Sequence, residues 1–229
     1  MHTNSIEKVL SYNQHWRPDN VTFSVSQLAS SSEYQLWLAF NKTPTSYVTD
    51  ISNNVNSVIG SGFHLIAEQA MADETEVLIE HQMLKEVDGH WISGTCDLIR
   101  EDTEYGVVFE DWKTMGVFQA KKLLAGEYED KVIQLSLYRY LYSIDNPQAK
   151  LSDYGLINMF VTGDTGYFNK ADGGGKVPKF AQVPIKLWSL EKTLKFIKYK
   201  LEMAKTEPVF DCADWQCDWC NLQCNKRKT

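Results

Sequence analysis

The chain has 229 residues, of which 43% are hydrophobic and 23% are charged, a composition typical of a globular protein. Its length suffices to bury one sizeable core. No apolar run approaches the roughly 20 residues of a membrane helix, and residues 1–16 lack the apolar stretch of a secretory signal. We therefore expect a cytoplasmic protein with no membrane partner. The net charge of −7 argues mildly against a nucleic-acid partner, without excluding one, because binding depends on the local field at the contact surface.

The first half of the chain predicts helices followed by three consecutive strands. Apolar residues recur at helical spacing over residues 24–40 and again over residues 50–72. The period then changes to that of a strand from Val77 onward. Asp88-Gly89 is a strong hairpin turn signal, with a return strand at about 90–100. A third, largely buried strand is expected at 105–112.

The second half of the chain returns to helices and then to strands. The expected elements are helices at about 117–125 and 129–144, a strand at 153–162, a Gly-rich loop at 163–176, a strand at 180–186 and a last helix at 189–205. This order predicts an α/β fold with a mixed β-sheet flanked by helices, rather than a doubly wound one.

Four short motifs follow one another through the predicted core. They are Gly60-Ser61-Gly62-Phe63-His64 on a helix, Gly94-Thr95-Cys96-Asp97 on the return strand, Asp111-Trp112-Lys113 at the end of the third strand, and Gln134 with Tyr138 on the long helix. Asp111 and Lys113 are two residues apart on a strand, so they project from the same face, at what we expect to be a solvent-facing strand end. Asp97 on the neighbouring strand can reach the same edge.

This placement of Asp97, Asp111 and Lys113 indicates a particular chemistry. Two carboxylates at a sheet edge make a hard oxygen site suited to Mg²⁺ or Mn²⁺. A lysine beside them can orient or deprotonate an attacking water and offset charge on a phosphate. The alternative for Asp111 and Lys113 is a simple ion pair at a strand end, but the apolar run Val107-Val108-Phe109 that leads into them and Asp97 on the adjacent strand favour a functional site.

The remaining polar residues near these motifs have structural alternatives. His64 could be a histidine of the core with its hydrogen bonds made inside the protein. Glu68, one helical turn later, is as well explained by a surface ion pair as by a role in supporting the metal ligands. Glu80, on the first strand of the hairpin, receives no assigned role. Gln134 and Tyr138 share a helix face, which ordinary packing against the sheet would also explain.

The four motifs resemble the PD-(D/E)XK nuclease superfamily and, within it, the RecB-like branch, which includes RecB-type exonucleases and CRISPR-associated nucleases. The motifs span residues 60–140, and the resemblance extends loosely from residue 24 to the C-terminus. It implies a restriction-endonuclease-like core that hydrolyses DNA phosphodiesters to a 5′-phosphate and a 3′-hydroxyl. The catalytic residues that it implies are Asp97, Asp111, Lys113, Gln134 and Tyr138, with Gln134 and Tyr138 holding Lys113 and the DNA backbone in place. The metal ligands that it implies are His64, Asp97, Asp111 and the Trp112 carbonyl oxygen.

Four cysteines crowd into the C-terminal tail, at Cys212, Cys217, Cys220 and Cys224, whereas Cys96 is read as a small core residue. Such crowding in a cytoplasmic protein suggests a metal site before disulfides. Many RecB-like nucleases bind an iron–sulfur cluster through three C-terminal cysteines and one that precedes the core. No cysteine precedes Cys96 here, so the alternatives are a cluster with Cys212 as the fourth ligand, a zinc ion, or free thiols.

The sequence therefore predicts a nuclease domain at residues 1–205, with an N-terminal helical part, and a Cys-rich metal-binding tail at residues 206–229. We expect an exonuclease of recombination, repair or phage DNA processing that acts on DNA with a free end or on single strands. One alternative is a structure-specific or nicking endonuclease. Another is a non-catalytic DNA-binding or scaffold protein with a protein partner, against which the intact Asp97, Asp111 and Lys113 argue.

Overall fold

The protein is described by a computed structural model over residues 19–42, 55–165 and 177–208. The four cysteines of the tail and most of the Gly-rich loop expected at 163–176 lie outside these ranges. Among the helices of the described residues, none combines the length and the apolar character needed to span a membrane.

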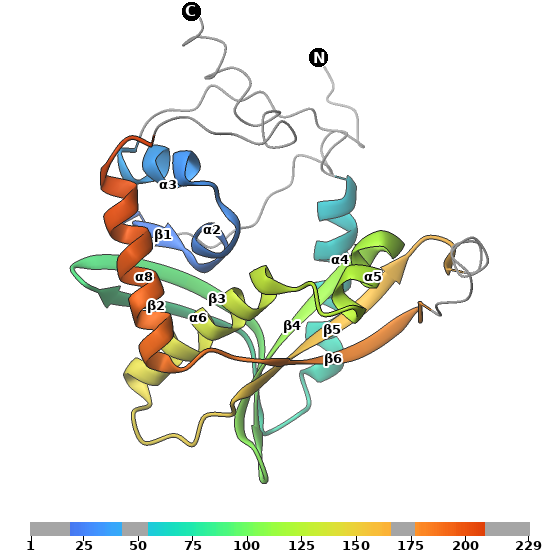
Figure 1. The fold of residues 1–229 in the computed structure, drawn as a ribbon. Coiled ribbons are helices and arrows are strands. Elements are labelled where there is room, and N and C mark those ends of the chain that lie inside the picture. Colours follow the sequence, from blue (N-terminus) through green and yellow to red (C-terminus); the bar gives the residue numbers. More distant parts are fainter. Residues whose placement is uncertain (1–18, 43–54, 166–176, 209–229) are drawn as a thin grey trace, which may run out of the picture.

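A six-stranded mixed sheet forms the centre of the fold (Figure 1). Its strands are β1 (Phe23–Ser24), β2 (Val77–Val87), β3 (His90–Asp102), β4 (Gly106–Gly116), β5 (Tyr154–Thr162) and β6 (Phe180–Lys186). The order is β1-β3-β4-β5-β6, with β2 also paired to β3. The β1–β3 and β4–β5 pairs are parallel and the other pairs are antiparallel. The predicted mixed sheet is therefore confirmed, while the two-residue β1 was not predicted.

The turn between β2 and β3 is the one that the sequence predicts. Asp88 and Gly89 both have positive φ, at 54° and 78°, and Val87 pairs directly with His90. Two central residues with positive φ define a type I′ turn, whose twist matches that of the flanking strands. The turn fixes the β2–β3 register and so decides which residues lie opposite one another near the site.

The segment predicted as one helix at 24–40 forms two, α2 (Val25–Ser30) and α3 (Glu33–Phe40). Ser31 is extended, with ψ of 144°, and Ser32 begins the second helix. The Ser32 hydroxyl accepts a hydrogen bond from the Gln35 backbone N–H while the Gln35 side chain accepts one from the Ser32 backbone. This capping box satisfies N–H groups that a new helix end exposes, and it outweighs the continuous apolar periodicity.

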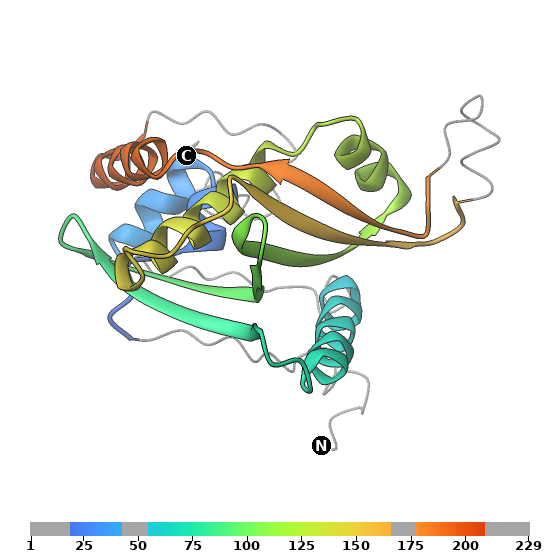
Figure 2. The ribbon, with the colours of Figure 1, turned by 90° about the horizontal axis from the view of Figure 1, so that it is seen from below.

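The other helices lie close to their predicted positions. They are α4 (Val55–Met71), α5 (Val117–Leu124), α6 (Glu129–Asp145) and α8 (Leu190–Lys205). Figure 2 shows α6 with α2, α3 and α8 on one side of the sheet and α4 on the other. The core lies between the sheet and α6, where Phe109, Leu137 and Ile157 are fully buried. The site residues described below come from β2, β3, β4 and the helices on both faces.

Candidate active site

Strand β4 presents Asp111 and Lys113 on one face, toward α6. The Lys113 ammonium Nζ lies 2.9 Å from Oδ1 and 2.7 Å from Oδ2 of Asp111. Asp111 is only 1% exposed, whereas the Lys113 side chain retains 28% of its exposure. The expectation of a solvent-facing strand end is therefore wrong for Asp111, because α6 covers this part of β4. Lys113 is the more accessible of the two groups.

Asp97 on β3 lies beside this pair and carries the most perturbed carboxylate of the site. Its Oδ2 accepts a hydrogen bond of 2.6 Å from the Trp112 backbone N–H. Burial, followed by the negative charge of Asp111, raises the pKa of Asp97 to about 7, against the lowering effects of Lys113, His64 and that hydrogen bond. Asp97 is therefore far easier to protonate than an ordinary aspartate.

Lys113 is a cation in this environment. Burial lowers the pKa of Lys113, but the charges of Asp111 and Asp97 and a hydrogen bond to Asp111 raise it, so the pKa lies above its ordinary value. The lysine is therefore protonated at neutral pH. It can act as a positive charge and hydrogen-bond donor toward an incoming anion.

Helix α6 positions Asp111 through Gln134 and Tyr138. The Gln134 amide Nε2 donates to Asp111 Oδ1 at 3.1 Å and to the Tyr138 hydroxyl at 3.0 Å. Tyr138 is 3% exposed, and burial raises its pKa well above the ordinary value. The resemblance implied that this pair holds Lys113; the structure shows that Gln134 contacts Asp111, which in turn contacts Lys113.

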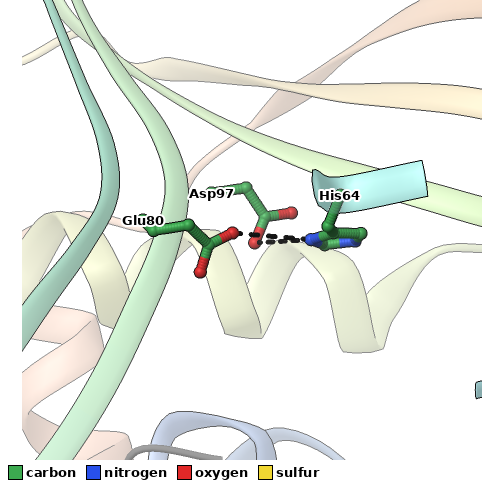
Figure 3. Close-up of side chains that lie close together, drawn as sticks. All are labelled: His64, Glu80 and Asp97. Carbon is green, nitrogen blue, oxygen red and sulfur yellow. Dashed lines mark ion pairs between the residues drawn. The ribbon is translucent and has the colours of Figure 1, made fainter. Parts of the chain in front are cut away.

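His64 approaches from α4, on the other face of the sheet. Its Nε2 lies 3.0 Å from the Trp112 carbonyl oxygen. Its Nδ1 lies 3.5 Å from Oε1 of Glu80 and 3.7 Å from Oδ1 of Asp97. Figure 3 shows both carboxylates directed toward this edge of the imidazole ring. One ligand atom each from His64, Glu80 and Asp97 lies within 4.8 Å of the others, so these residues could hold a metal ion.

Glu80 is the member of this group to which the sequence assigned no role. Its φ is 46°, in the left-handed region, although it lies in the middle of β2. Positive φ is costly for a side chain of this kind, and no sequence pattern predicts it here. A contact between this glutamate and His64 could therefore not be inferred from strand alternation. A pocket lies next to the group, lined in part by Ala67, Glu68 and Met71 of α4.

The residues that the motifs single out thus gather at one place in the described part of the chain. His64 and Asp97 lie beside the Trp112 backbone, and Asp111 joins Lys113 to Gln134 and Tyr138. Their catalytic and ligand roles remain predictions. The cysteine site at 212–224 is outside the described residues.

Several solved structures resemble this fold. SSO0001 matches with a TM-score of 0.56 and 17% identity, over 96% of this chain and 90% of that one. A phage-related exonuclease from Haemophilus somnus 129PT matches with a TM-score of 0.48 and 10% identity, over 90% of this chain and 97% of that one. LHK-Exo, solved in complex with dAMP, matches with a TM-score of 0.46 and 10% identity, over 90% of this chain and 92% of that one. No protein-family model and no curated protein matches the chain.

The likeness to SSO0001 is one of fold, and it covers nearly the whole chain. In this chain, α4 precedes three antiparallel strands, and α6 leads to β5, which is parallel to β4. The mixed β-sheet flanked by helices that the sequence predicts is confirmed. A fold does not by itself fix an activity, which has to be argued from the site.

Proposed function

We propose that this protein is a divalent-metal-dependent nuclease that hydrolyses phosphodiester bonds of DNA, with Asp97, Asp111 and Lys113 at its catalytic centre. The observation that carries the proposal is the contact of the Lys113 ammonium with both oxygens of the buried Asp111, next to Asp97. A simple surface ion pair would not need a buried aspartate, a neighbouring carboxylate or the amide of Gln134. Together these groups place the positively charged Lys113 next to two carboxylates, Asp111 and Asp97, that can bind a cation.

The residues present suit a divalent cation. Carboxylate oxygens and one imidazole are ligands that Mg²⁺ and Mn²⁺ accept. The raised pKa of Asp97 supports the same conclusion, because burial and then the charge of Asp111 disfavour its ionised form in the protein itself. A bound cation would favour the ionised form of both. We therefore propose that His64, Asp97 and Asp111 hold the ion.

The side chains divide the work of hydrolysis. A divalent cation, when bound at this site, would lower the pKa of water and offset charge on the phosphate. Lys113, protonated and partly exposed, binds a phosphate oxygen and stabilises the charge that develops there in the transition state. Gln134 and Tyr138 keep Asp111 in one orientation, so the carboxylate does not have to be ordered during the reaction. The expected products are a 5′-phosphate and a 3′-hydroxyl.

We further propose that the substrate is DNA with a free end or in single-stranded form, as for the exonucleases of the resembling branch. A direct test compares linear DNA labelled at one end with covalently closed circular DNA, each in single- and double-stranded form, in Mg²⁺ and in Mn²⁺. An exonuclease degrades the linear substrates and leaves the circles intact. Nicking of the circles would instead assign the endonuclease alternative, and no cleavage of any form would support the non-catalytic DNA-binding one.

For the tail, we propose that Cys212, Cys217, Cys220 and Cys224 bind one structural metal centre, either an iron–sulfur cluster or a zinc ion. The dense cysteine spacing supports this. Protein purified without oxygen should carry the metal in stoichiometric amount. A cluster would colour the protein brown, whereas zinc would appear only in elemental analysis. Protein that carries neither iron nor zinc would leave four free thiols.

A further inference from the structure

The contacts of His64 indicate which of its two ring nitrogens carries a proton. Nε2 lies 3.0 Å from the Trp112 carbonyl oxygen, an ordinary hydrogen-bond distance. A carbonyl oxygen can only accept, so Nε2 is the donor. In the neutral ring, Nδ1 then bears the lone pair. The nitrogen that is free to bind a metal is therefore Nδ1, which points away from Trp112.

The surroundings of Nδ1 contain two negatively charged acceptors. Glu80 Oε1 and Asp97 Oδ1 lie 3.5 and 3.7 Å from it, longer than an ordinary hydrogen bond (Figure 3). The lone pair of Nδ1 and those of the two carboxylate oxygens repel one another unless a cation lies between the three atoms. Oxygen and nitrogen ligands about 2.1 Å from Mg²⁺ or Mn²⁺ lie roughly 3 to 4 Å apart around the ion. The observed separations fall in this range.

The backbone at Glu80 supports the same arrangement. Within the described β2–β3 ladder, Ile79 pairs with Leu98 and His81 with Cys96, but Glu80 and Asp97 between them are unpaired. The left-handed φ of Glu80 accompanies this break. Strained backbone of this kind persists chiefly at functional sites.

We propose that Glu80 is a metal ligand, which binds one divalent cation together with His64 Nδ1 and Asp97 Oδ1. The Trp112 carbonyl, expected as a ligand from the family resemblance, instead accepts the Nε2–H of His64 and fixes the ring. Ligating histidines commonly donate their second ring N–H to a carbonyl or carboxylate in this way. The inference rests on the proposed function only in requiring that the site binds a divalent cation.

The first test is a titration of the folded, full-length protein with Mn²⁺, followed by calorimetry or by the electron paramagnetic resonance signal of free Mn²⁺. Glu80→Gln should weaken Mn²⁺ binding at least tenfold. Glu68→Gln is the matched control, since Glu68 lines the same pocket but lies outside the ligand group. It should change the affinity less than about threefold. Unchanged binding in Glu80→Gln, or an equal loss in both variants, would overturn the proposal.

A further variant separates a ligand from a merely structural residue. Glu80→Gly removes the carboxylate and also relieves the positive φ. The metal-free variant should melt no lower than wild type yet bind Mn²⁺ at least tenfold more weakly. A lower melting temperature with unchanged Mn²⁺ affinity would assign Glu80 a structural role and contradict the proposal.

The choice of ring nitrogen is tested by replacing His64 with an amide of either length. Asn places its amide near the position of Nδ1, and Gln places it near Nε2. His64→Asn should therefore retain more Mn²⁺ affinity than His64→Gln, and the reverse order would overturn the assignment of Nδ1. These titrations do not depend on DNA cleavage. Mn²⁺ binding that requires Glu80 in a protein without nuclease activity would reject the proposed function alone.

Discussion

Gln134 donates a hydrogen bond of 3.1 Å to Oδ1 of Asp111, the same oxygen that accepts one of 2.9 Å from Lys113. This contact joins the middle of the sheet to helix α6, and the amide also reaches the hydroxyl of Tyr138. Asp111 is thus held from two sides. Its carboxylate plane is set by groups that the fold itself keeps in place, rather than by solvent.

Removing this amide should affect catalysis more than folding. In Gln134→Ala, Asp111 loses one of its two donors and gains rotational freedom, so we expect kcat to fall about tenfold or more. Stability should fall by only about 1 kcal/mol, the typical net contribution of one hydrogen bond. Steady-state kinetics and urea unfolding measure the two effects. Tyr138→Phe, which keeps the ring and removes the hydroxyl, should be milder; wild-type kcat in Gln134→Ala would contradict the account.

Gly94 on β3 should tolerate no side chain. A Cβ built at this position would lie 2.7 Å from Val25 Cγ2 and 2.9 Å from Tyr138 Cε1. Gly94→Ala should therefore cost about 1–3 kcal/mol of unfolding free energy, as overpacked cores do, and should lower activity by displacing Tyr138. Gly62→Ala is the control, because a Cβ there meets nothing within 4 Å, and in a helix it should stabilise by about 0.5–1 kcal/mol. Equal stability changes in the two variants, measured by denaturant unfolding, would rule out the steric explanation.

The metal-free protein should lose stability as the pH rises from about 4 to about 7. Asp97 has an ordinary pKa of 3.8 when unfolded and a pKa of about 7 when folded. A carboxyl with a raised folded pKa contributes stability at low pH, where it is protonated in both states, and this contribution is lost as the pH passes through the folded value. The loss is on the order of a few kcal/mol. The nearby Glu80 carboxylate is the largest cause of a raised pKa of His64, which acts in the same direction.

Thermal unfolding of wild type and Asp97→Asn at several pH values measures this effect. The variant has no carboxyl to titrate, so its melting temperature should overtake that of wild type as the pH rises. Saturating Mn²⁺ should remove the decline in wild type, since metal binding requires the deprotonated ligands. A wild-type curve parallel to that of Asp97→Asn in metal-free buffer would show that Asp97 titrates normally.

The sequence predicted those parts of the site that follow from strand alternation and motif order. Asp111 and Lys113 share a face because they are two residues apart on a strand, and Gln134 and Tyr138 share a face because they are four apart on a helix. The short connection from Asp102 to Gly106 sets the β3–β4 register that brings Asp97 to the same edge. These relationships are local or depend on one turn, so the sequence pattern alone was enough to predict them.

Other features depend on tertiary context that no local pattern contains. The left-handed φ of Glu80 breaks the alternation rule on which its placement would have been predicted. The burial of Asp111 depends on how α6 packs over β4. In α4, Ile59 and Ile66 keep 48% and 64% of their exposure although their spacing is that of an apolar stripe. Helical periodicity indicates a helix but does not say how much of its surface the fold will cover.

The measurement that tests the central claim most directly is the single-turnover rate of linear DNA cleavage in Mn²⁺ for wild type, Asp111→Asn and Lys113→Ala. Lys195→Ala serves as the control, because it removes an exposed lysine paired with Glu191 on α8. Wild type and Lys195→Ala should cleave at similar rates, and the other two variants should be slower by about 10² to 10⁴. Circular dichroism should show all four folded. Folded Asp111→Asn or Lys113→Ala that retains more than about a tenth of the wild-type rate, against those expected losses, would contradict the assignment of this site as the catalytic centre.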